Sequence, residues 1–349
     1  MSTTASATAA HRPAVTPTTG MSWQAGTPCP CCGESAAQVV ATRDGKTGEA
    51  LLTVECARCG LGRIDPLPTP EALADWYAHH YRQEYKGAVQ PALRHVLRAG
   101  RNALLRWDWL QRHQLALPWT GAAHCGRSLD IGASSGEFVA LMREVGIDAH
   151  GIEPHAGYAG YAQQSMQLQI LHGPLQQRLL DFAPASLDLV TMFHVLEHLV
   201  DPLPTLRQIA DRLSPGGVLY IEVPNATRPC SPHYMFFRAH VLYFTGLSLR
   251  QTLQAAGLQV LAHSADDADN LSIVARRADA PQAPVFEHRP DLVQSQRQRR
   301  WIPYLWDQVL EGQPFARIGQ RLEEKRTARQ FSAGPVLLKS LYARSAAST

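Results

Sequence analysis

The sequence predicts an α/β protein whose main domain is a parallel sheet with helices on both faces. From Ser128 to about residue 278, short apolar runs alternate with runs of helical periodicity, which is typical of such a sheet. Five of the seven cysteines lie between Cys29 and Cys59, and this clustering indicates a small metal-binding unit ahead of the main domain. The chain has 349 residues, which is enough for two or three such units.

Composition and charge argue against several classes of function. The net charge is only +3, so the chain as a whole has no strong attraction to nucleic acid or to an anionic membrane. No run of about 18 apolar residues occurs, and no membrane span is predicted. The first residues are rich in Ser, Thr and Ala and lack the features of an export signal, so we expect a disordered tail and a cytoplasmic protein.

Changes of pattern divide the chain into five segments. Thr69 and Pro70 have the form of an N-cap and a first helical residue, and the apolar residues that follow recur at helical spacing. The last segment is rich in Gln and Arg and is expected to be helical. The segments are a disordered tail, a cysteine-rich unit, a helical linker, the main domain and a C-terminal helical extension: 1–26, 27–68, 69–121, 122–278 and 279–349.

Within the main domain the expected elements follow one another in a regular order. Helical runs such as "GEFVALMREVG" and "DPLPTLRQIADRLSPGG" separate the strands. Two later runs, "LQVLAHSADD" and "NLSIVARRA", lie close enough in sequence to form a terminal hairpin. The five earlier strand-like runs are "SLDIGA", "DAHGIEP", "LQILHG", "LDLVTMF" and "GVLYIEVPN".

A turn of small residues, 132–136, follows the first of these strands. Its glycines allow a ligand to lie against the backbone, and the next helix begins with unpaired N–H groups. Open parallel sheets bind ligands beyond the carboxyl ends of their strands. Glu153 ends the next strand, where its carboxylate could accept hydrogen bonds from two ribose hydroxyls. Taken alone, this turn is equally compatible with an α/β domain that binds no nucleotide.

Further motifs favour a specific family. The spacing of Asp130, Gly132, Ser134 and Gly136 resembles the first motif of class I S-adenosylmethionine-dependent methyltransferases, with Ser134 in place of the middle glycine. The stretches "LDLVTMFHVLEHLVDP" and "RQIADRLSPGGVLYIEVPN" resemble the fourth and fifth strands of the subgroup that includes ubiquinone-biosynthesis and many sugar methyltransferases. The resemblance covers about residues 122–278. It implies a Rossmann-like, seven-stranded sheet with S-adenosylmethionine as the cofactor.

The resemblance also assigns roles to residues at the ends of the strands. Asp130 would lie near the methionine amino group or order the loop, and Glu153 would bind ribose. Leu175 would lie beside adenine, while Phe193 and His194 would close the methionine end. The predicted cofactor-binding residues are Asp130, Gly132, Ala133, Ser134, Gly136, Glu153, Pro154, Leu175 and Phe193.

The sequence "HVLEH" begins where the fourth strand ends, and this is where the methyl group would point. His194 and His198 are four residues apart, so a helical turn would place both on one face, with Glu197 beside His194. Methyl transfer to oxygen needs an acceptor that loses its proton, which a histidine can take while a carboxylate orients it. A later element contains His233 and His240. The predicted catalytic residues are His194, Glu197, His198 and His240.

Two other roles remain open for these histidines. "HVLEH" with the later His-x-x-x-Phe-Thr resembles small-RNA 3′-end 2′-O-methyltransferases, in which a Glu-x-x-Glu-His motif and a later histidine bind a divalent metal. His194 stands where that motif has its first glutamate, although three histidines and a glutamate can still ligate Zn, Fe or Mn. Alternatively, His198 and His240 are hydrogen-bonded scaffolding for the acceptor loop.

The cysteine cluster has the spacing of a zinc ribbon. Cys29 and Cys32 form one Cys-x₂-Cys pair, Cys56 and Cys59 form a second, and a glycine follows each pair. Cys31 is expected to be the spare cysteine, pointing away from the others. Four thiolates saturate a zinc ion, so the predicted role of the metal is folding or docking rather than catalysis.

A zinc ribbon ahead of a methyltransferase domain resembles bacterial methyltransferases that act on sugars, including nucleotide-sugar C-methyltransferases and enzymes of surface-polysaccharide assembly. The C-methyltransferases carry a further α/β domain, for which the segment after residue 278 is too short. We therefore predict an enzyme that methylates a hydroxyl of a small-molecule or glycan acceptor, namely a sugar, nucleotide-sugar or surface glycan.

Three alternatives remain: a sugar C-methyltransferase, a small-RNA 2′-O-methyltransferase, and a cofactor-binding docking protein without catalysis. Basic residues do not gather around aromatic residues in 27–278, so nucleic acid is the less favoured acceptor. The arginines near Arg299 are expected to form a solvated helix face. The sequence leaves the oligomeric state undetermined.

Overall fold

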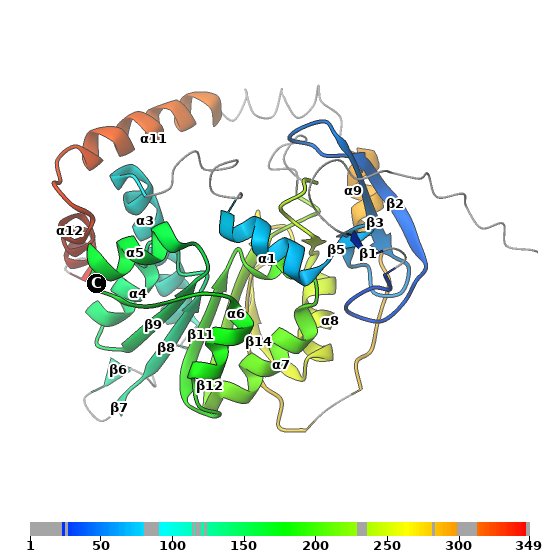
Figure 1. Ribbon diagram of the computed structural model, residues 1–349, viewed down its shortest axis with the longest axis horizontal. Helices are drawn as coiled ribbons and strands as arrows, with labels where there is room; N and C mark the ends of the chain where they lie inside the picture. The colour runs from blue at the N-terminus through cyan, green and yellow to red at the C-terminus, as the bar shows by residue number, and fades with distance from the viewer. Residues whose placement is uncertain are drawn as a thin grey trace, which may run out of the picture.

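The computed structural model describes residues 23–24, 27–79, 91–113, 115, 120–121, 124–228, 236–280, 283–298 and 313–346. Its centre is a seven-stranded sheet in the order β10-β9-β8-β11-β12-β15-β14 (Figure 1). The first five strands of this order run parallel, whereas β15 runs antiparallel to both of its neighbours. The strands are β8 (Arg127–Ile131), β9 (Asp148–Glu153), β10 (Gln169–His172), β11 (Leu187–Phe193), β12 (Leu213–Pro224), β14 (Leu258–His263) and β15 (Asn270–Arg277).

This architecture confirms the predicted α/β sheet and the hairpin of its last two strands. The central strands β8 and β11 are buried on both faces, which explains why their sequences are nearly continuous apolar runs. Successive side chains of β12 enter opposite cores: Leu219 and Ile221 lie in one hydrophobic cluster, whereas Val218 and Tyr220 lie in the other.

Helices cover both faces of the sheet. One core is closed by α3 (Leu93–Arg112), α4 (Glu137–Glu144), α5 (Ala156–Gln164) and α12 (Gly334–Ala346). The other is closed by α7 (Pro202–Arg212) and α8 (Gly246–Ala255). The short elements are α6 (Leu175–Arg178), the 3-10 helices η2 (Leu179–Asp181) and η3 (Leu196–His198), and the pair β6 (Thr120–Gly121) and β7 (His124–Cys125).

The cysteine-rich unit forms a sheet that is shared with the main domain. Its own strands, β2 (Ala37–Arg43), β3 (Ala50–Cys56) and β4 (Gly62–Ile64), are antiparallel. The fourth strand of this sheet is β13 (Leu242–Tyr243), which comes from the main domain and pairs with β4. A division of the chain into 27–68 and 122–278 therefore describes the order of the sequence but separates strands that pair in space.

The segment that follows the cysteines turns back toward the sheet. β5 (Leu67–Pro68) pairs with β1 (Trp23–Gln24) and leads into α1 (Pro70–His79). The Thr69 Oγ1 accepts a hydrogen bond from the Ala72 N–H at 3.2 Å, which confirms the predicted N-cap. The second helix of the predicted linker, α3, packs into the main core through Val96 and Trp107.

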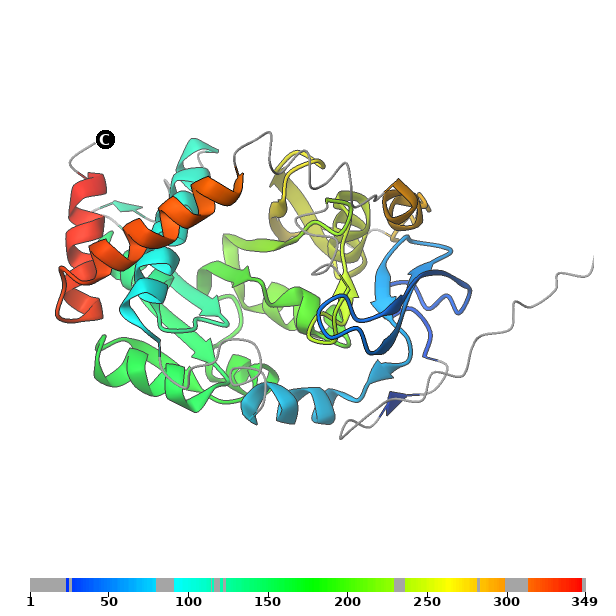
Figure 2. The same cartoon turned by 90° about the horizontal axis from the view of Figure 1, so that it is seen from above.

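The C-terminal segment contributes to both ends of the molecule (Figure 2). Helix α9 (Asp291–Gln298) lies against the cysteine-rich unit, because the buried Glu55 carboxylate accepts the N–H groups of Leu292 and Val293 at 3.1 and 3.2 Å. Helices α11 (Gln313–Ala328) and α12 lie at the opposite end, where Arg101 of α3 forms an ion pair with Glu323 of α11. In the part of the chain that the structure describes, no helix has the length and apolarity needed to span a membrane.

Candidate active site

A cavity of about 870 Å³ opens at the carboxyl ends of β8, β9, β10 and β11. Its volume lies in the range of small-molecule binding sites. Helices α1 and α7 supply part of its wall, including Leu73 and Thr205. Among the residues predicted from sequence, the lining contains Gly132, Ser134, Glu153, Pro154, Leu175, Phe193, His194 and His198.

The glycine turn follows β8 directly at the cavity wall. Gly132 has a φ of 76°, and a side chain there would bring its Cβ within 2.5 Å of Val195. Gly136 has a φ of 87° and precedes α4, whose N-terminus faces the turn. Ser134 also has a positive φ of 53°, in the left-handed region that glycine adopts most readily. The backbone here is shaped for close approach by a ligand.

Glu153 is held at the end of β9 by the backbone around it. Its Oε2 accepts the N–H of Ser134 at 2.8 Å, and its Oε1 accepts the N–H of His155 at 2.9 Å. Carboxylate oxygens can each accept more than one hydrogen bond. The carboxylate therefore has a fixed orientation at the cavity wall.

Three of the predicted cofactor residues lie behind the cavity wall rather than on it: Asp130, Ala133 and Gly136. The carboxylate of Asp130 accepts a hydrogen bond from Thr191 Oγ1 at 2.6 Å and so ties β8 to β11. Burial raises the pKa of Asp130 to about 7, against the opposing effects of Thr191 and of the Arg106 charge. In this geometry Asp130 orders the strand end that carries the glycine turn.

Four titratable side chains predicted from sequence converge at the end of β11. Glu197 Oε1 lies 3.5 Å from His194 Nδ1, 3.8 Å from His198 Nε2 and 3.9 Å from His240 Nε2. The Glu197 side chain is 2% exposed, and neither carboxylate oxygen has a hydrogen-bond partner among the described residues. The buried carboxylate is thus balanced by the imidazoles around it. We refer to these four residues as the histidine cluster.

The charges of this cluster differ from residue to residue. Burial alone would raise the pKa of Glu197, but the neighbouring histidines lower it to about 2. The His194 side chain is 40% exposed; loss of solvation opposes its charged form, but Glu197 and Glu222 raise its pKa to about 9. For His240, burial together with the charge of His198 lowers the pKa to about 3. Near neutral pH, Glu197 is ionised, His194 carries a proton and His240 is neutral.

These shifts predict a pH dependence of stability. The unfolded chain takes up a proton on His240 below about pH 6.5, whereas the folded chain does so only near pH 3. This contribution to stability is complete above pH 6.5 and is lost as the pH falls, by at most about 1.4 kcal/mol per pH unit. We expect His240→Gln to lose less stability than the wild type between pH 6.5 and 5, measured by urea unfolding. Equal losses in the two proteins would contradict the assigned neutral state.

His198 has a defined tautomer. Its Nδ1 lies 2.7 Å from the carbonyl oxygen of Ala239, and because a carbonyl only accepts, we assign the proton to Nδ1. The lone pair of a neutral His198 is then on Nε2, the atom that faces Glu197. The His198 and His240 rings meet edge to face with centroids 4.9 Å apart. In this tautomer, Nε2 is the ring nitrogen that can accept a proton.

The predicted helical turn from His194 to His198 is wrong in its geometry. His194 has a φ of 56° and stands outside η3, the 3-10 helix that contains Glu197 and His198. Its N–H donates to the carbonyl of Glu222 at 2.8 Å, so it remains bonded to the neighbouring strand. β11 ends at Phe193, and the chain that follows places Glu197 between the histidines.

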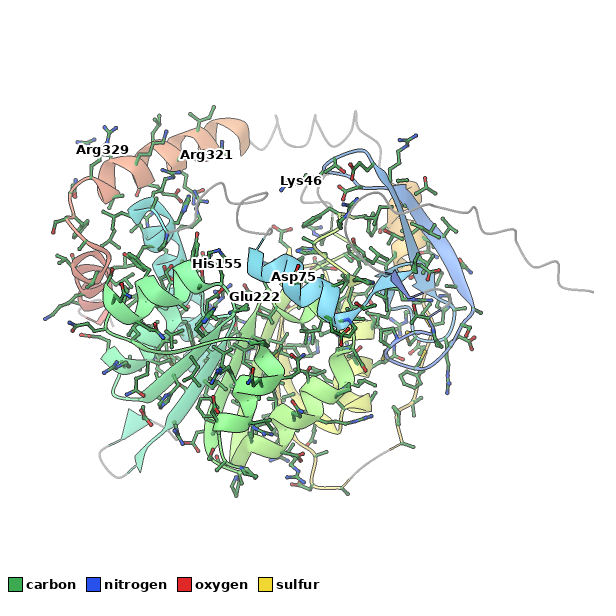
Figure 3. All side chains as sticks on the ribbon, in the orientation of Figure 1. Lys46, Asp75, His155, Glu222, Arg321 and Arg329 are labelled. Atoms are coloured by element: carbon green, nitrogen blue, oxygen red, sulfur yellow. The ribbon has the colours of Figure 1, made fainter. Side chains whose placement is uncertain are left out.

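Two further residues of the site were missed by sequence reasoning. Glu222 of β12 lies 3.2 Å from His194 Nε2, and Arg106 of α3 lies 2.5 Å from the same carboxylate. The Arg106 guanidinium also stands 4.0 Å from the centre of the Phe193 ring. Figure 3 labels Glu222, which lies near the carboxyl end of β12. An acidic residue in the otherwise apolar "GVLYIEVPN" was a usable signal for Glu222, whereas nothing in the sequence of α3 points to Arg106.

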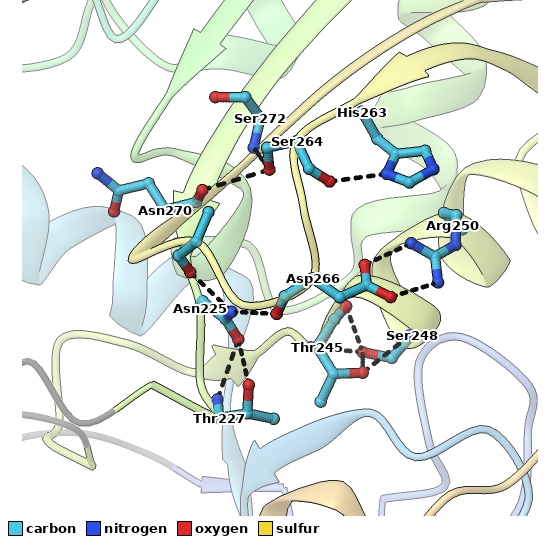
Figure 4. A network of polar contacts seen from close by, with 11 residues as sticks. Asn225, Thr227, Thr245, Ser248, Arg250, His263, Ser264, Asp266, Asn270 and Ser272 are labelled. Carbon is cyan, nitrogen blue, oxygen red and sulfur yellow. Dashed lines mark hydrogen bonds and ion pairs between the residues drawn. The ribbon is translucent and has the colours of Figure 1, made fainter.

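A polar network fixes the chain beyond β12 (Figure 4). Asn225 Nδ2 donates to the carbonyls of Asp266 and Ala268, each at 2.8 Å. Its Oδ1 accepts the hydroxyl of Thr227 at 2.7 Å. The strand end next to the histidine cluster is thereby held to the loop between β14 and β15.

The four predicted zinc ligands are also brought together. The Sγ atoms of Cys29 and Cys59 are 3.6 Å apart, and those of Cys32 and Cys56 are 3.5 Å apart. A disulfide would need about 2.05 Å, whereas thiolates about 2.3 Å from one zinc ion lie about 3.8 Å apart. All four sulfurs lie within 4.8 Å of one another, so the set fits a tetrahedral ion. Cys31 stands outside this set and accepts a hydrogen bond from Thr252 at 3.4 Å. Its thiol also interacts with that of Cys59, so the prediction that it points away from the other cysteines is wrong.

A second group of side chains also has its possible metal-ligand atoms close together. It consists of Glu197, His198 and His240, whose ligand atoms also lie within 4.8 Å of one another. The separations of 3.8 and 3.9 Å are too long for hydrogen bonds, so the metal role considered for the histidine cluster stays open.

Comparison with known proteins yields one consistent set of similarities. A family model described as a methyltransferase domain matches residues 77–263. The ubiquinone biosynthesis O-methyltransferase of Idiomarina loihiensis is 30% identical over 108 residues, covering 28% of this chain and 42% of that protein. A probable S-adenosylmethionine-dependent methyltransferase of Mycolicibacterium smegmatis is 27% identical over 161 residues, covering 44% of this chain and 60% of that protein. The chain thus spans about half the length of the curated relatives it matches.

Among solved structures, an S-adenosylmethionine-dependent methyltransferase from Archaeoglobus fulgidus aligns with 56% of this chain and 98% of its own. The sequence identity is 18% and the TM-score is 0.39.

Proposed function

Since this chain belongs to the methyltransferase-domain family, we propose that it transfers a methyl group from S-adenosylmethionine to an acceptor hydroxyl. One observation carries this proposal. A single cavity is lined both by Gly132, Ser134 and Glu153 and by His194 and His198. The first group is suited to a nucleoside, and the second is suited to a hydroxyl that loses its proton. S-adenosylmethionine, when bound, supplies an electrophilic methyl group.

In this proposal the glycine turn and the β9 end hold the cofactor. Glu153 accepts the ribose hydroxyls, while Pro154 and Leu175 pack against adenine and Phe193 closes the methionine end. These side chains fit the group because they line one cavity, and the sheet order places Leu175 after β10, Glu153 at the end of β9 and Phe193 at the end of β11. Asp130, Ala133 and Gly136 support the turn from behind.

We expect Glu153→Ala to weaken binding of S-adenosylhomocysteine by about 100-fold, because two charge-assisted hydrogen bonds are lost. Isothermal titration calorimetry measures this directly. Glu153→Gln is the matched control: it keeps the size and one acceptor oxygen, and we expect an intermediate loss. Unchanged affinity in Glu153→Ala would show that the cofactor does not use this carboxylate.

The histidine cluster carries out the proton chemistry. His198 Nε2 accepts the proton of the acceptor hydroxyl as the oxygen attacks the methyl group, and the buried Glu197 stabilises the imidazolium that forms. His194 is already protonated, so it orients the site through Glu197 and Glu222. His240 packs against His198 and keeps its ring in place. Most of the rate enhancement then comes from holding the two reactants in line.

A sugar, nucleotide-sugar or surface glycan is the acceptor we propose. One support is the order of the units, with the predicted zinc ribbon ahead of the catalytic domain. The other is helix α1, which brings Glu71 to the cavity wall, where a carboxylate can bind sugar hydroxyls. A phenolic hydroxyl is the second candidate. The names of the relatives support it, as do the apolar side chains of Leu73, Leu199 and Val200 at the same wall.

A panel of nucleotide-sugars and catechols, assayed by formation of S-adenosylhomocysteine, distinguishes these acceptors. Turnover with sugars alone supports the first candidate, and turnover with catechols alone supports the second. Binding of cofactor without turnover on any acceptor would favour a docking protein. Salt-sensitive binding of single-stranded RNA would instead favour the nucleic-acid alternative.

We also propose that Cys29, Cys32, Cys56 and Cys59 hold one zinc ion. The support is the thiol geometry together with the size of the segment, which is too small to build an adequate core by itself. The ion would have no open position for substrate, so its contribution is structural.

A further inference from the structure

The chain segment that carries His240, residues 236–243, is bonded along its length to the cysteine-rich unit. On the C-terminal side of His240, strand β13 pairs with β4. The N–H of Ile64, the last residue of β4, donates to the carbonyl of Val241 at 3.0 Å. The residue that follows His240 is therefore hydrogen-bonded to the sheet of the cysteine-rich unit.

On the N-terminal side of His240, the contact is made by Asp44, which lies in the turn between β2 and β3. Asp44 Oδ2 accepts the backbone N–H of Arg238 at 2.9 Å. Its Oδ1 accepts the N–H groups of Lys46 and Thr47 at 2.8 and 3.0 Å, which closes the turn. Asp44 is 2% exposed, so these bonds are shielded from water. One buried carboxylate thus joins the turn of the cysteine-rich unit to the segment with His240.

The same segment is bonded to the rest of the histidine cluster. The N–H of Val241 donates to the carbonyl of Glu197 at 3.0 Å, while its carbonyl accepts from β4. The carbonyl of Ala239 fixes the tautomer of His198. A displacement of this segment would therefore change the positions of His198 and Glu197 as well as that of His240.

Close packing leaves the segment little room to shift independently. The hydroxyl of Tyr243 donates to the carbonyl of Phe237 at 3.1 Å and accepts its N–H at 3.0 Å. The Phe237 ring lies against His240 with centroids 4.2 Å apart. Gly62 of β4 approaches so closely that an added Cβ would lie 2.8 Å from the Cβ of Tyr243. The loop around His240 is therefore held by hydrogen bonds between its own two ends and packs against β4.

We infer that Asp44 is a positioning residue for the histidine cluster, and that the cysteine-rich unit is a structural part of the acceptor site rather than an appended module. Asp44 acts through Arg238 and β4 acts through Val241, so that the unit sets where His198 and His240 stand. The kinetic consequence rests on the proposed methyl transfer, whereas the structural consequence does not.

The variant Asp44→Asn tests this inference. Its Oδ1 can still close the turn, but an amide NH₂ replaces the oxygen that accepts the Arg238 N–H. We expect turnover of the acceptor to fall by about 10- to 100-fold, since small displacements of a catalytic group have effects of this size. Affinity for S-adenosylhomocysteine and the zinc content should stay unchanged. The matched control is Glu49→Gln, which removes only the partly exposed ion pair with the Arg238 side chain and should behave as wild type.

A spectroscopic readout separates this inference from the proposed function. In ¹⁵N-histidine NMR spectra, Asp44→Asn should shift the ring signals of His198 and His240 and leave those of His263, which lies on β14 outside the cavity lining, unchanged. Such shifts support the inference even if no acceptor is turned over. Unshifted His198 and His240 signals, or full turnover in Asp44→Asn, would overturn it. An equal loss of cofactor affinity would also overturn it, because the effect would then not be confined to the acceptor side.

Discussion

Replacing His198 with alanine is expected to reduce methyl transfer by about 100- to 10,000-fold and to leave S-adenosylhomocysteine affinity unchanged. Its Nε2 is the atom assigned to accept the hydroxyl proton, and general bases contribute effects of this size. Single-turnover assays with saturating cofactor measure the loss, and calorimetry measures the binding.

The chain offers a matched control for this variant. His263 also has its Nδ1 2.7 Å from a carbonyl oxygen, that of Ser264, but it lies on β14 outside the cavity lining. We expect His263→Ala to retain full turnover. If His198→Ala also retained full turnover, the base would be another group, and His240 would be the next to test. A loss of cofactor binding in His198→Ala would instead show that the cluster supports the cofactor side of the cavity.

Replacing Cys56 with serine is expected to remove the zinc ion and to lower acceptor turnover strongly, while most of the cofactor affinity remains. Structural zinc contributes a binding free energy on the order of 10 kcal/mol at neutral pH, and this free energy maintains the fold of the small unit. β4 follows the second cysteine pair and pairs with β13, so unfolding of the unit would release the segment with His240. Glu153 and the glycine turn lie at the ends of β9 and β8, which do not pair with the cysteine-rich unit, so we expect them to keep their contacts.

Metal analysis, calorimetry and turnover assays on the same preparations test this expectation. Cys31→Ser is the control, because Cys31 lies beside the four ligands but outside their set, and it should retain one zinc per chain. If the double variant Cys29→Ser/Cys56→Ser still held one zinc, the metal would lie elsewhere. The group of Glu197, His198 and His240 would then become the leading site.

Local sequence patterns determined much of this protein. The alternation of apolar strands and amphipathic helices specifies a parallel sheet, because strands covered on both faces must be apolar throughout. Gly132 and Gly136 mark a turn in which both have positive φ angles and close neighbours, and a residue with a side chain would be strained at either position. The Cys-x₂-Cys spacing brings two thiols of each pair together within one turn. Each of these features depends on residues that are near one another in the chain.

Only the tertiary structure decided how distant segments complete the site. Glu222 and Arg106 reach His194 from β12 and α3, and their pairing depends on how the helix packs over the sheet. The left-handed conformation of His194 arises from the path between β11 and β12, which no periodicity in "HVLEH" encodes. The pairing of β4 with β13 joins the cysteine-rich unit to the segment that carries His240, although most of the main domain's sequence lies between the two strands. Backbone hydrogen bonds of this kind carry no side-chain signature, so the sequence identifies the chemical groups while the packing of the whole chain determines which of them meet.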